Sequence, residues 1–227
     1  MRMLAAYHKE PALRFISHLD VQRTLHRALA RADIPLRFSA GFNPHPLVSF
    51  ASALATGMAG EAEWFDAQLE SDMAPGDFSA RLNAALPAGL FVSGAMAAPE
   101  GMGSLSGLLR AAAYEARLEM DSLVAEDALN AALSALLGGE IIVNKRTKSG
   151  PKPVDIRPEI LKVSVDRVEG RSLTLHVLGR LQADGGLRME LFLHALFERL
   201  AARGEALVCR RALYFDPDGP LPRLPQD

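Results

Sequence analysis

Histidines and carboxylates that could do acid–base or metal chemistry gather in the N-terminal part of the chain. The motif FISHLD contains His18 and Asp20, and the motif GFNPHP contains His45. A histidine at the start of a helix is favoured in its neutral form, because the positive end of the helix dipole disfavours a cation there. Neutral imidazole can act as a base or as a metal ligand. Together with two carboxylates further along the chain, the candidate catalytic residues are His18, Asp20, His45, Glu63 and Asp66.

These candidates match no local catalytic motif. The sequence contains no His-Glu-x-x-His pattern, no glycine-rich phosphate loop and no Gly-x-Ser-x-Gly element. We therefore expect no metal and no other cofactor, and an acid–base or metal site built from the five residues is the alternative. For His18, packing against the sheet at the helix start is an equally plain interpretation, and for His45 a local hydrogen bond is.

The single cysteine excludes several chemistries for this chain alone. Cys209 cannot form an internal disulfide, and it cannot supply the set of cysteines that an iron–sulfur cluster or a zinc ribbon needs. Its apolar neighbours predict a buried, inert thiol.

The GFNPHP motif predicts a rigid loop. Proline fixes its own φ angle and pushes the preceding residue into extended geometry, so Asn43 and His45 are both held out of a helix. A rigid loop loses little entropy when it docks on a ligand or a partner. A plain turn between two strands is the alternative. The candidate docking loop comprises Gly41, Phe42, Asn43, Pro44, His45 and Pro46.

Two basic features could contact phosphates. Arg23, Arg27 and Arg31 recur at helical spacing opposite an apolar stripe, and a basic stretch follows at residues 144–158. Clusters of one charge sign suit a nucleic-acid backbone, although a solvated surface is the common meaning of such clusters. The candidate nucleic-acid-binding residues are Arg23, Arg27, Arg31, Lys145, Arg146, Lys148, Lys152 and Arg157.

The order of predicted elements is β-α-β-β-α-β, twice. Ser17 is a predicted N-cap for a helix whose apolar stripe includes Val21, Leu25 and Leu29. The first set of expected strands covers residues 3–7 with 13–16, 36–38, 47–54, 63–69 and 90–96, and its second helix covers 78–86. In the second set, strands are expected at 113–120, 141–144 with 160–168, 172–181 and 207–215, and helices at 125–137 and 189–202. This order predicts an α+β fold of two tandem ferredoxin-like (βαββαβ) modules with antiparallel sheets.

The composition and the breaks in this pattern predict the domain organisation. We expect one domain at 1–100, a glycine-rich linker at 101–107, a second domain with the basic loop at 108–216 and a proline-rich tail at 217–227. The net charge of −2 indicates no partner by itself. The N-terminus lacks the long apolar stretch of a signal peptide, and no run reaches the length of a membrane span. These features predict a cytoplasmic protein without a membrane partner.

A long part of the sequence resembles a known family. The run FISHLDVQRTLHRALARADIPLRFSAGFNPHPLVSFASAL, followed by Gly57 and Glu63-Trp64-Phe65-Asp66, is similar to the radical-SAM-linked protein family, a domain of unknown function. The stretch VDIRP at 154–158 resembles the signature of the family's second half. The chain departs from the family at Ala30-Arg31, where members often have paired arginines, and at Ala55-Thr56-Gly57, where a proline often precedes the glycine.

The resemblance implies a partner more than a reaction. Members of that family occur beside, or fused to, radical S-adenosylmethionine enzymes with a cobalamin-type domain, in a context of RNA modification or processing. It implies an accessory protein, not itself a radical enzyme, that binds RNA and presents it to such an enzyme. An enzyme acting through the five candidate residues and a protein-docking module without nucleic acid are the alternatives.

Overall fold

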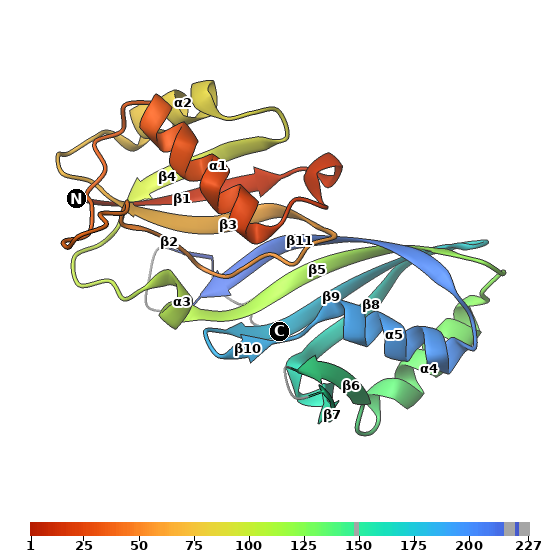
Figure 1. The fold of residues 1–227 in the computed structure, drawn as a ribbon. Coiled ribbons are helices and arrows are strands. Elements are labelled where there is room, and N and C mark those ends of the chain that lie inside the picture. Colours follow the sequence, from red (N-terminus) through yellow and green to blue (C-terminus); the bar gives the residue numbers. More distant parts are fainter. Residues whose placement is uncertain (148–149, 216–220, 223–227) are drawn as a thin grey trace. The chain divides into compact units, whose positions relative to one another are not determined.

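The computed structural model describes residues 1–147, 150–215 and 221–222. These residues form two compact units. One unit consists of Met1–Arg110 and Cys209–Asp227, and the other of Ala111–Val208. Both are mixed α/β units with mostly antiparallel sheets (Figure 1). Among the described residues, no helix is long and apolar enough to cross a bilayer.

The first unit is built on an antiparallel sheet. Strand β1 lies between β3 and β4, and both β2 and β11 neighbour β3. Leu4 faces Asp66 on β3 and Met96 on β4, which fixes the register of the three central strands. The elements are β1 (Arg2–Lys9), η1 (Pro11–Leu13), α1 (His18–Arg31), β2 (Val48–Phe50), β3 (Met58–Gln68), α2 (Pro75–Ala85), β4 (Leu90–Ala97) and α3 (Leu105–Leu108).

Helices α1 and α2 cover one face of this sheet (Figure 1). The apolar stripe of α1 buries Leu25 and Leu29 in the core, where they join Tyr7 of β1, Phe65 of β3 and Phe78 of α2. Because side chains alternate between the two faces of a strand, the residues of β3 that share the face of Phe65 also lie under the helices. This alternation places Glu63 beneath α1.

The second unit also mixes strands and helices, and it contains an additional β-hairpin, β6–β7, and the short strand β10. Strand β9 pairs antiparallel with β5 and with β8, and β5 neighbours β11. Helices α4 and α5 pack against each other. The elements are β5 (Leu109–Met120), α4 (Glu126–Leu137), β6 (Ile142–Thr147), β7 (Gly150–Asp155), η2 (Arg157–Glu159), β8 (Ile160–Glu169), β9 (Ser172–Gln182), β10 (Gly185–Gly186), α5 (Met189–Leu200) and β11 (Gly204–Phe215).

Several expected strands are shorter or absent. Residues 13–16 do not continue β1; a 3-10 turn forms at Pro11–Leu13, since Pro11 cannot donate to a ladder. Residues 36–38 form only isolated bridges, Leu36 to Leu69 and Phe38 to Pro46, and the strand expected at 47–54 is reduced to Val48–Phe50.

The basic stretch and the glycine-rich stretch also differ from expectation. Strands β6 (Ile142–Thr147) and β7 (Gly150–Asp155) pair antiparallel where a basic loop is expected. The short helix α3 begins inside the stretch 101–107. Most of the proline-rich tail lies outside the described residues, but Leu221 is buried and the Phe215 amide donates to the Pro222 carbonyl.

Candidate nucleic-acid interface

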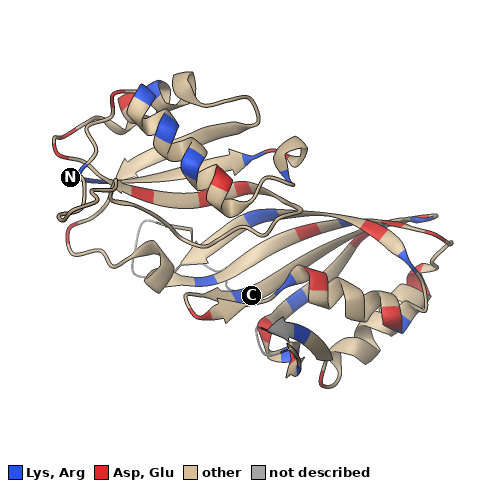
Figure 2. Ribbon diagram, viewed as in Figure 1, with Lys and Arg blue, Asp and Glu red and all other residues tan. Residues whose placement is uncertain are grey.

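Helix α1 carries the predicted arginines on its exposed side. Ser17 caps the helix: its hydroxyl accepts a hydrogen bond from the Asp20 amide at 3.2 Å, as the sequence predicts. The buried side of the helix fixes its rotation, so Arg23, Arg27 and Arg31 are exposed. Figure 2 shows the blue bands of basic residues along α1. We call these three residues the arginine ridge.

The arginine ridge is only lightly engaged within the protein. Arg23 Nη1 lies 3.2 Å from Asp20 Oδ1, an exposed pair of the kind that adds little stability. Arg27 Nε donates to the Arg23 carbonyl, and Arg31 Nη2 donates to the Ala85 carbonyl at 2.7 Å. A guanidinium has five donors, so each of these side chains keeps donors that point to solvent.

The GFNPHP loop is closed at its base and open at its tip. Ser39 and His45 bridge the base: the Ser39 amide donates to the His45 carbonyl at 2.9 Å, and the Ser39 hydroxyl accepts from the His45 amide at 3.1 Å and lies 2.9 Å from His45 Nδ1. Gly41 has a φ of 125°, a conformation that favours glycine. The loop places the side chain of Phe42 fully in solvent, at 101% relative exposure.

Other phenylalanines of the first unit are exposed as well, among them Phe15, Phe38 and, to a smaller extent, Phe91. Phe15 is 69% exposed and Phe38 is 49% exposed. The Arg14 guanidinium lies 4.4 Å from the centroid of the Phe15 ring. An exposed aromatic ring offers a face on which a planar group can stack, as Arg14 does on Phe15. Sequence reasoning missed Phe15 and Phe38, because the local sequence does not show that these rings face solvent.

His26 connects the loop to α1. Burial lowers the pKa of His26, and the nearby His45 lowers that pKa further. The interaction places the loop beside the helix, so the loop and the arginine ridge belong to one region of the unit. His26 Nε2 is buried and has no hydrogen-bond partner among the described residues.

Glu63, a candidate catalytic residue, forms a buried ion pair. Its two oxygens accept from Arg210 Nε at 2.7 Å and from Arg210 Nη2 at 2.5 Å. Both residues are almost wholly buried, at 1% and 3% exposure. The bidentate geometry satisfies both oxygens, so Glu63 is committed to a structural role.

Asp66 forms a second structural ion pair. Arg2 Nη2 donates to Asp66 Oδ2 at 2.8 Å, while Arg2 Nη1 donates to the carbonyls of Met102 and Gly103. The pair therefore fastens the segment before α3 to the sheet. The remaining acid, Asp20, accepts from the Ser17 hydroxyl, which lowers the Asp20 pKa, with a smaller contribution from Arg23.

His18 and Lys9 lie near the buried pair. Burial lowers the pKa of His18, and the positive charges of Arg210 and Lys9 also lower it, while Glu63 opposes them. Lys9 is 1% exposed; its ammonium donates to the carbonyls of Ile16 at 2.8 Å and Arg14 at 3.2 Å. Burial lowers the pKa of Lys9, and it raises the pKa of Tyr7.

The five acid–base candidates do not form one site. Glu63 lies near His18, but Asp66 pairs with Arg2, Asp20 accepts from the hydroxyl of the N-cap Ser17 and His45 closes a loop. Among the described residues, no group of three or more histidine, cysteine, aspartate or glutamate side chains could hold a metal ion. The alternative metal site is therefore not assembled by the part of the chain that the structure describes.

In the second unit, the β6–β7 hairpin carries the basic stretch. Lys145 faces Lys152 directly across the two strands, and both side chains are exposed. Like charges directly opposite each other are destabilising, and a bound anion would relieve that repulsion. Lys148 lies outside the described residues, as does the position of the Arg146 side chain.

Arg157 differs from the other basic candidates. Its Nε donates to the Leu137 carbonyl at 2.7 Å, and its Nη1 donates to the Ile160 carbonyl at 2.9 Å. The Arg157 amide also donates to Asp155 Oδ1, which accepts the Ile141 amide as well. These bonds join the end of α4 to the base of the hairpin, so Arg157 is engaged in structure.

Solved structures with a similar fold come from ribonucleoprotein complexes. A Cbf5–Nop10–Gar1 complex has a TM-score of 0.59 at 14% identity, over 95% of this chain and 50% of that chain. An archaeal box H/ACA sRNP Nop10–Cbf5 complex has a TM-score of 0.52 at 12% identity, over 96% and 49%. An H/ACA RNP bound to a substrate RNA containing 2′-deoxyuridine has a TM-score of 0.53 at 12% identity, over 95% and 49%. The chain spans about half the length of these chains, and identities this low show the fold alone.

Sequence comparison places the chain in a family. No curated protein matches it. The family DUF2344, described as "Uncharacterized protein conserved in bacteria", matches residues 2–188. Because this match covers most of the chain, from β1 to the start of α5, the protein belongs to the DUF2344 family.

Proposed function

We propose that this protein binds single-stranded RNA through the first unit. The contact surface comprises Phe15, which lies just before α1, the arginine ridge along that helix, and Phe38 and Phe42 in the segment after it; we call it the aromatic–arginine surface. The observation that carries the proposal is Phe42, wholly exposed at the tip of a loop that lies beside α1.

The chemistry of this surface suits unpaired bases. Exposed aromatic rings stack on bases that are not already stacked in a duplex, and arginines contact the phosphates between them. The loop is already closed by Ser39 and His45, so Phe42 needs little ordering when a base stacks on it. A double helix would offer the phosphates but not the base faces.

The β6–β7 hairpin supplies additional phosphate contacts in this proposal. Lys145 and Lys152 are exposed and of the same charge, which favours an anionic partner. Arg157 is left out, because its guanidinium holds the hairpin base.

The fold is consistent with an RNA role. We propose that each unit is a ferredoxin-like module. In support, the strand orders are β2-β3-β1-β4 and β8-β9-β5-β11, which correspond position by position. One of the similar structures is an H/ACA RNP bound to a substrate RNA. Likeness of fold does not establish function, so the site chemistry carries the argument.

Salt-dependent binding to a uridine-rich single-stranded RNA tests the proposal. Each phosphate contact contributes about −0.7 to the slope of log affinity against log salt, so Arg27→Gln should flatten the slope by about that amount. Phe42→Ala should remove one stacked base, about 1–3 kcal/mol, and Phe42→Tyr should retain it. Phe91→Ala, which removes a partly exposed ring stacked on His8, is the matched control.

Two outcomes would overturn the proposal. One is no detectable binding of single-stranded RNA at low salt. The other is binding that Phe42→Ala and Phe91→Ala weaken equally, because the aromatic–arginine surface would then have no special role.

The partner in this proposal is the radical S-adenosylmethionine enzyme that the sequence resemblance implies, to which the protein would present RNA. Support for this part comes from the resemblance. Co-purification of the two proteins, with and without ribonuclease treatment, tests it. Association that survives the treatment while RNA binding is absent would favour the protein-docking alternative.

A further inference from the structure

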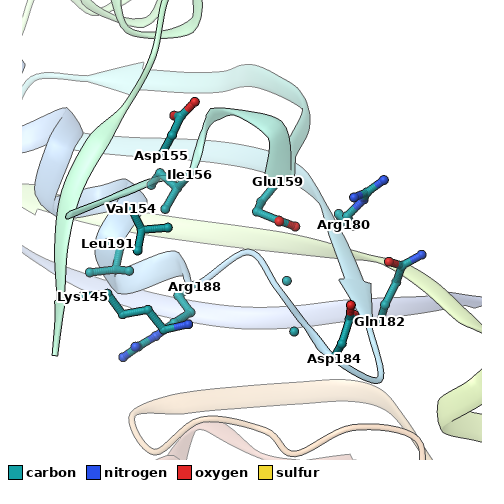
Figure 3. A pocket seen from close by; sticks show the side chains of 12 residues that line it. Lys145, Val154, Asp155, Ile156, Glu159, Arg180, Gln182, Asp184, Arg188 and Leu191 are labelled. Atoms are coloured by element: carbon teal, nitrogen blue, oxygen red, sulfur yellow. The ribbon is translucent and has the colours of Figure 1, made fainter. Parts of the chain in front are cut away.

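A pocket of about 190 Å³ lies in the second unit, at the foot of the β6–β7 hairpin (Figure 3). The hairpin, η2, the end of β9, the β9–β10 turn and the start of α5 all contribute to it. The charged or amide side chains that line it and enter the argument are Lys145, Glu159, Arg180, Gln182, Asp184 and Arg188. Pockets for drug-sized ligands are about 300–1,000 Å³, so this one can enclose a single base while the rest of a nucleotide extends to its rim.

A tight turn shapes one wall of the pocket. Gly186 has a φ of 159°, and a Cβ atom there would lie 2.4 Å from the Arg180 carbonyl oxygen and 2.7 Å from Leu181 Cα. Only glycine allows the chain to pass so close to β9. The turn brings Asp184 to the pocket and sends the chain directly into α5.

One side of the pocket favours an anion. Figure 3 shows Lys145 and Arg188 next to each other on the side opposite Glu159 and Asp184. Arg188 is the N-cap of α5, and no side chain caps the free amides of that helix's first turn. Arg188 Nε donates to Glu190 Oε1 at 2.6 Å, so the charge of Lys145, the remaining guanidinium donors of Arg188 and the positive end of the helix are what favours a phosphate there. Lys145 has no hydrogen bond or ion pair to another described residue that would occupy its charge.

The opposite side favours a hydrogen-bond donor. Glu159 Oε2 is buried and has no partner among the described residues. An unsatisfied buried carboxylate oxygen is costly, and only a donor can satisfy it, because an ionised carboxylate accepts bonds without donating any. Asp155, in contrast, turns its carboxylate away from the pocket to the amides of Ile141 and Arg157 (Figure 3).

We propose that this pocket binds a guanine nucleotide, with the base on Glu159 and the phosphate on Lys145, Arg188 and the start of α5. Among the four common bases, guanine alone presents two adjacent N–H donors on its Watson–Crick edge, which match the two oxygens of a carboxylate. Adenine, cytosine and uracil each place at least one acceptor against the carboxylate. The ligand is either a free nucleotide or an unpaired guanosine of RNA, and only the second source rests on the proposed function.

Calorimetric titration of the full chain with 5′-monophosphates tests the proposal. Guanosine monophosphate should bind at least about tenfold more tightly than adenosine monophosphate, since one charged hydrogen bond is worth about that factor. Inosine monophosphate, which lacks the amino group, should fall between them. Inorganic phosphate should bind far more weakly than any of the three nucleotides.

Two variants separate the two ends of the ligand. Glu159→Gln should abolish the preference for guanine, while Glu205→Gln, which changes an exposed glutamate that does not line the pocket, should keep it. Lys145→Gln should weaken all nucleotides by a similar factor and leave the preference in place. A pocket that binds no guanosine monophosphate, or a preference that survives Glu159→Gln, would overturn the proposal.

The affinity for two RNA strands shows whether the ligand is a free nucleotide or a guanosine within RNA. A uridine-rich strand with one guanosine should bind more tightly than the all-uridine strand if RNA is the source, and equally if free nucleotide is. The all-uridine strand contains no guanine, so its binding reports on the contacts of the proposed function, at the aromatic–arginine surface and the hairpin lysines, without the base contact of the pocket. Failure of the pocket and failure of the proposed function are therefore distinguishable.

Discussion

The buried pair of Glu63 and Arg210 gives a sharp prediction, because the chain contains a matched exposed pair two residues away. Glu61 pairs with Arg211, and both of those side chains are about two-fifths exposed. Glu63 and Arg210 lie on the neighbouring positions of the same two strands and are almost wholly buried. The same substitution, Glu→Gln, can therefore be made in the same strand at an exposed position and at a buried one.

The expected magnitudes differ strongly. Glu63→Gln removes the negative charge that faces Arg210 in the interior, with the buried Lys9 nearby, and breaking a buried ion pair in this way costs about 3–5 kcal/mol. For a chain of this size that loss lowers the melting temperature by roughly 6–20 °C. Glu61→Gln should cost at most about 1 kcal/mol, because water screens the exposed pair.

Urea unfolding of each variant measures these costs. Adding Arg210→Met to Glu63→Gln should recover part of the loss, since replacing both charges of a buried pair is often neutral. Equal destabilisation by Glu61→Gln and Glu63→Gln would refute the reasoning. So would a double variant whose loss equals the sum of the two single losses, because the two residues would then not be coupled.

Three further predictions concern pH, a tethered turn and the hairpin base. Burial lowers the pKa of His18 and of His26, so the unfolded state takes up protons first and the free energy of unfolding should fall as the pH drops below about 6.5. His26→Asn should flatten this fall in a urea titration series, and an unchanged profile would contradict it. Lys9→Met removes the donor shared by two carbonyls of the turn before α1, so hydrogen exchange in peptide 10–17 should quicken; unchanged exchange would show that the ammonium does not hold the turn. Arg157→Lys should lower the free energy of unfolding by about 1–3 kcal/mol in urea without changing RNA affinity. Weaker RNA binding at unchanged stability would instead show that Arg157 contacts RNA.

Helix α1 was predictable because its signals are local. The Ser17 cap, the stripe of Val21, Leu25 and Leu29, and the opposite arginine ridge lie within one short segment, and the structure confirms the helix and its cap. The family likewise follows from long motifs in the same region, and the match to DUF2344 confirms a family of uncharacterized function. The mixed fold with mostly antiparallel sheets is also confirmed.

The partners of the acids could not be predicted, because they are distant in sequence. Glu63 meets Arg210 147 residues away, and Asp66 meets Arg2 64 residues away. Nothing near Glu63 distinguishes a catalytic carboxylate from half of a buried ion pair. The strand expected at 36–38 is also limited by distant partners. Residues 36–38 make only isolated bridges, and a hydrogen bond from the Leu47 amide to the Arg37 carbonyl joins the two ends of the intervening loop.

The exposed rings were also beyond sequence reasoning. Phenylalanine is typical of protein cores, so the sequence alone does not show that Phe15 and Phe38 face solvent. Only the fold shows it. The same holds for the pocket at the foot of the β6–β7 hairpin, which joins the hairpin, η2 and the start of α5 across more than 40 residues of sequence. Its glycine turn at 185–186 carries no recognisable phosphate-binding motif.

Crosslinking of a single-stranded RNA that contains 4-thiouridine tests the central claim most directly. After irradiation and digestion, mass spectrometry locates the protein residues bonded to the RNA. Crosslinks should fall on the peptides that carry Phe15, Phe38 or Phe42, and the Phe42→Ala variant should lose those at the loop. Crosslinks confined to other parts of the chain, with none at the three rings, would contradict the proposed surface.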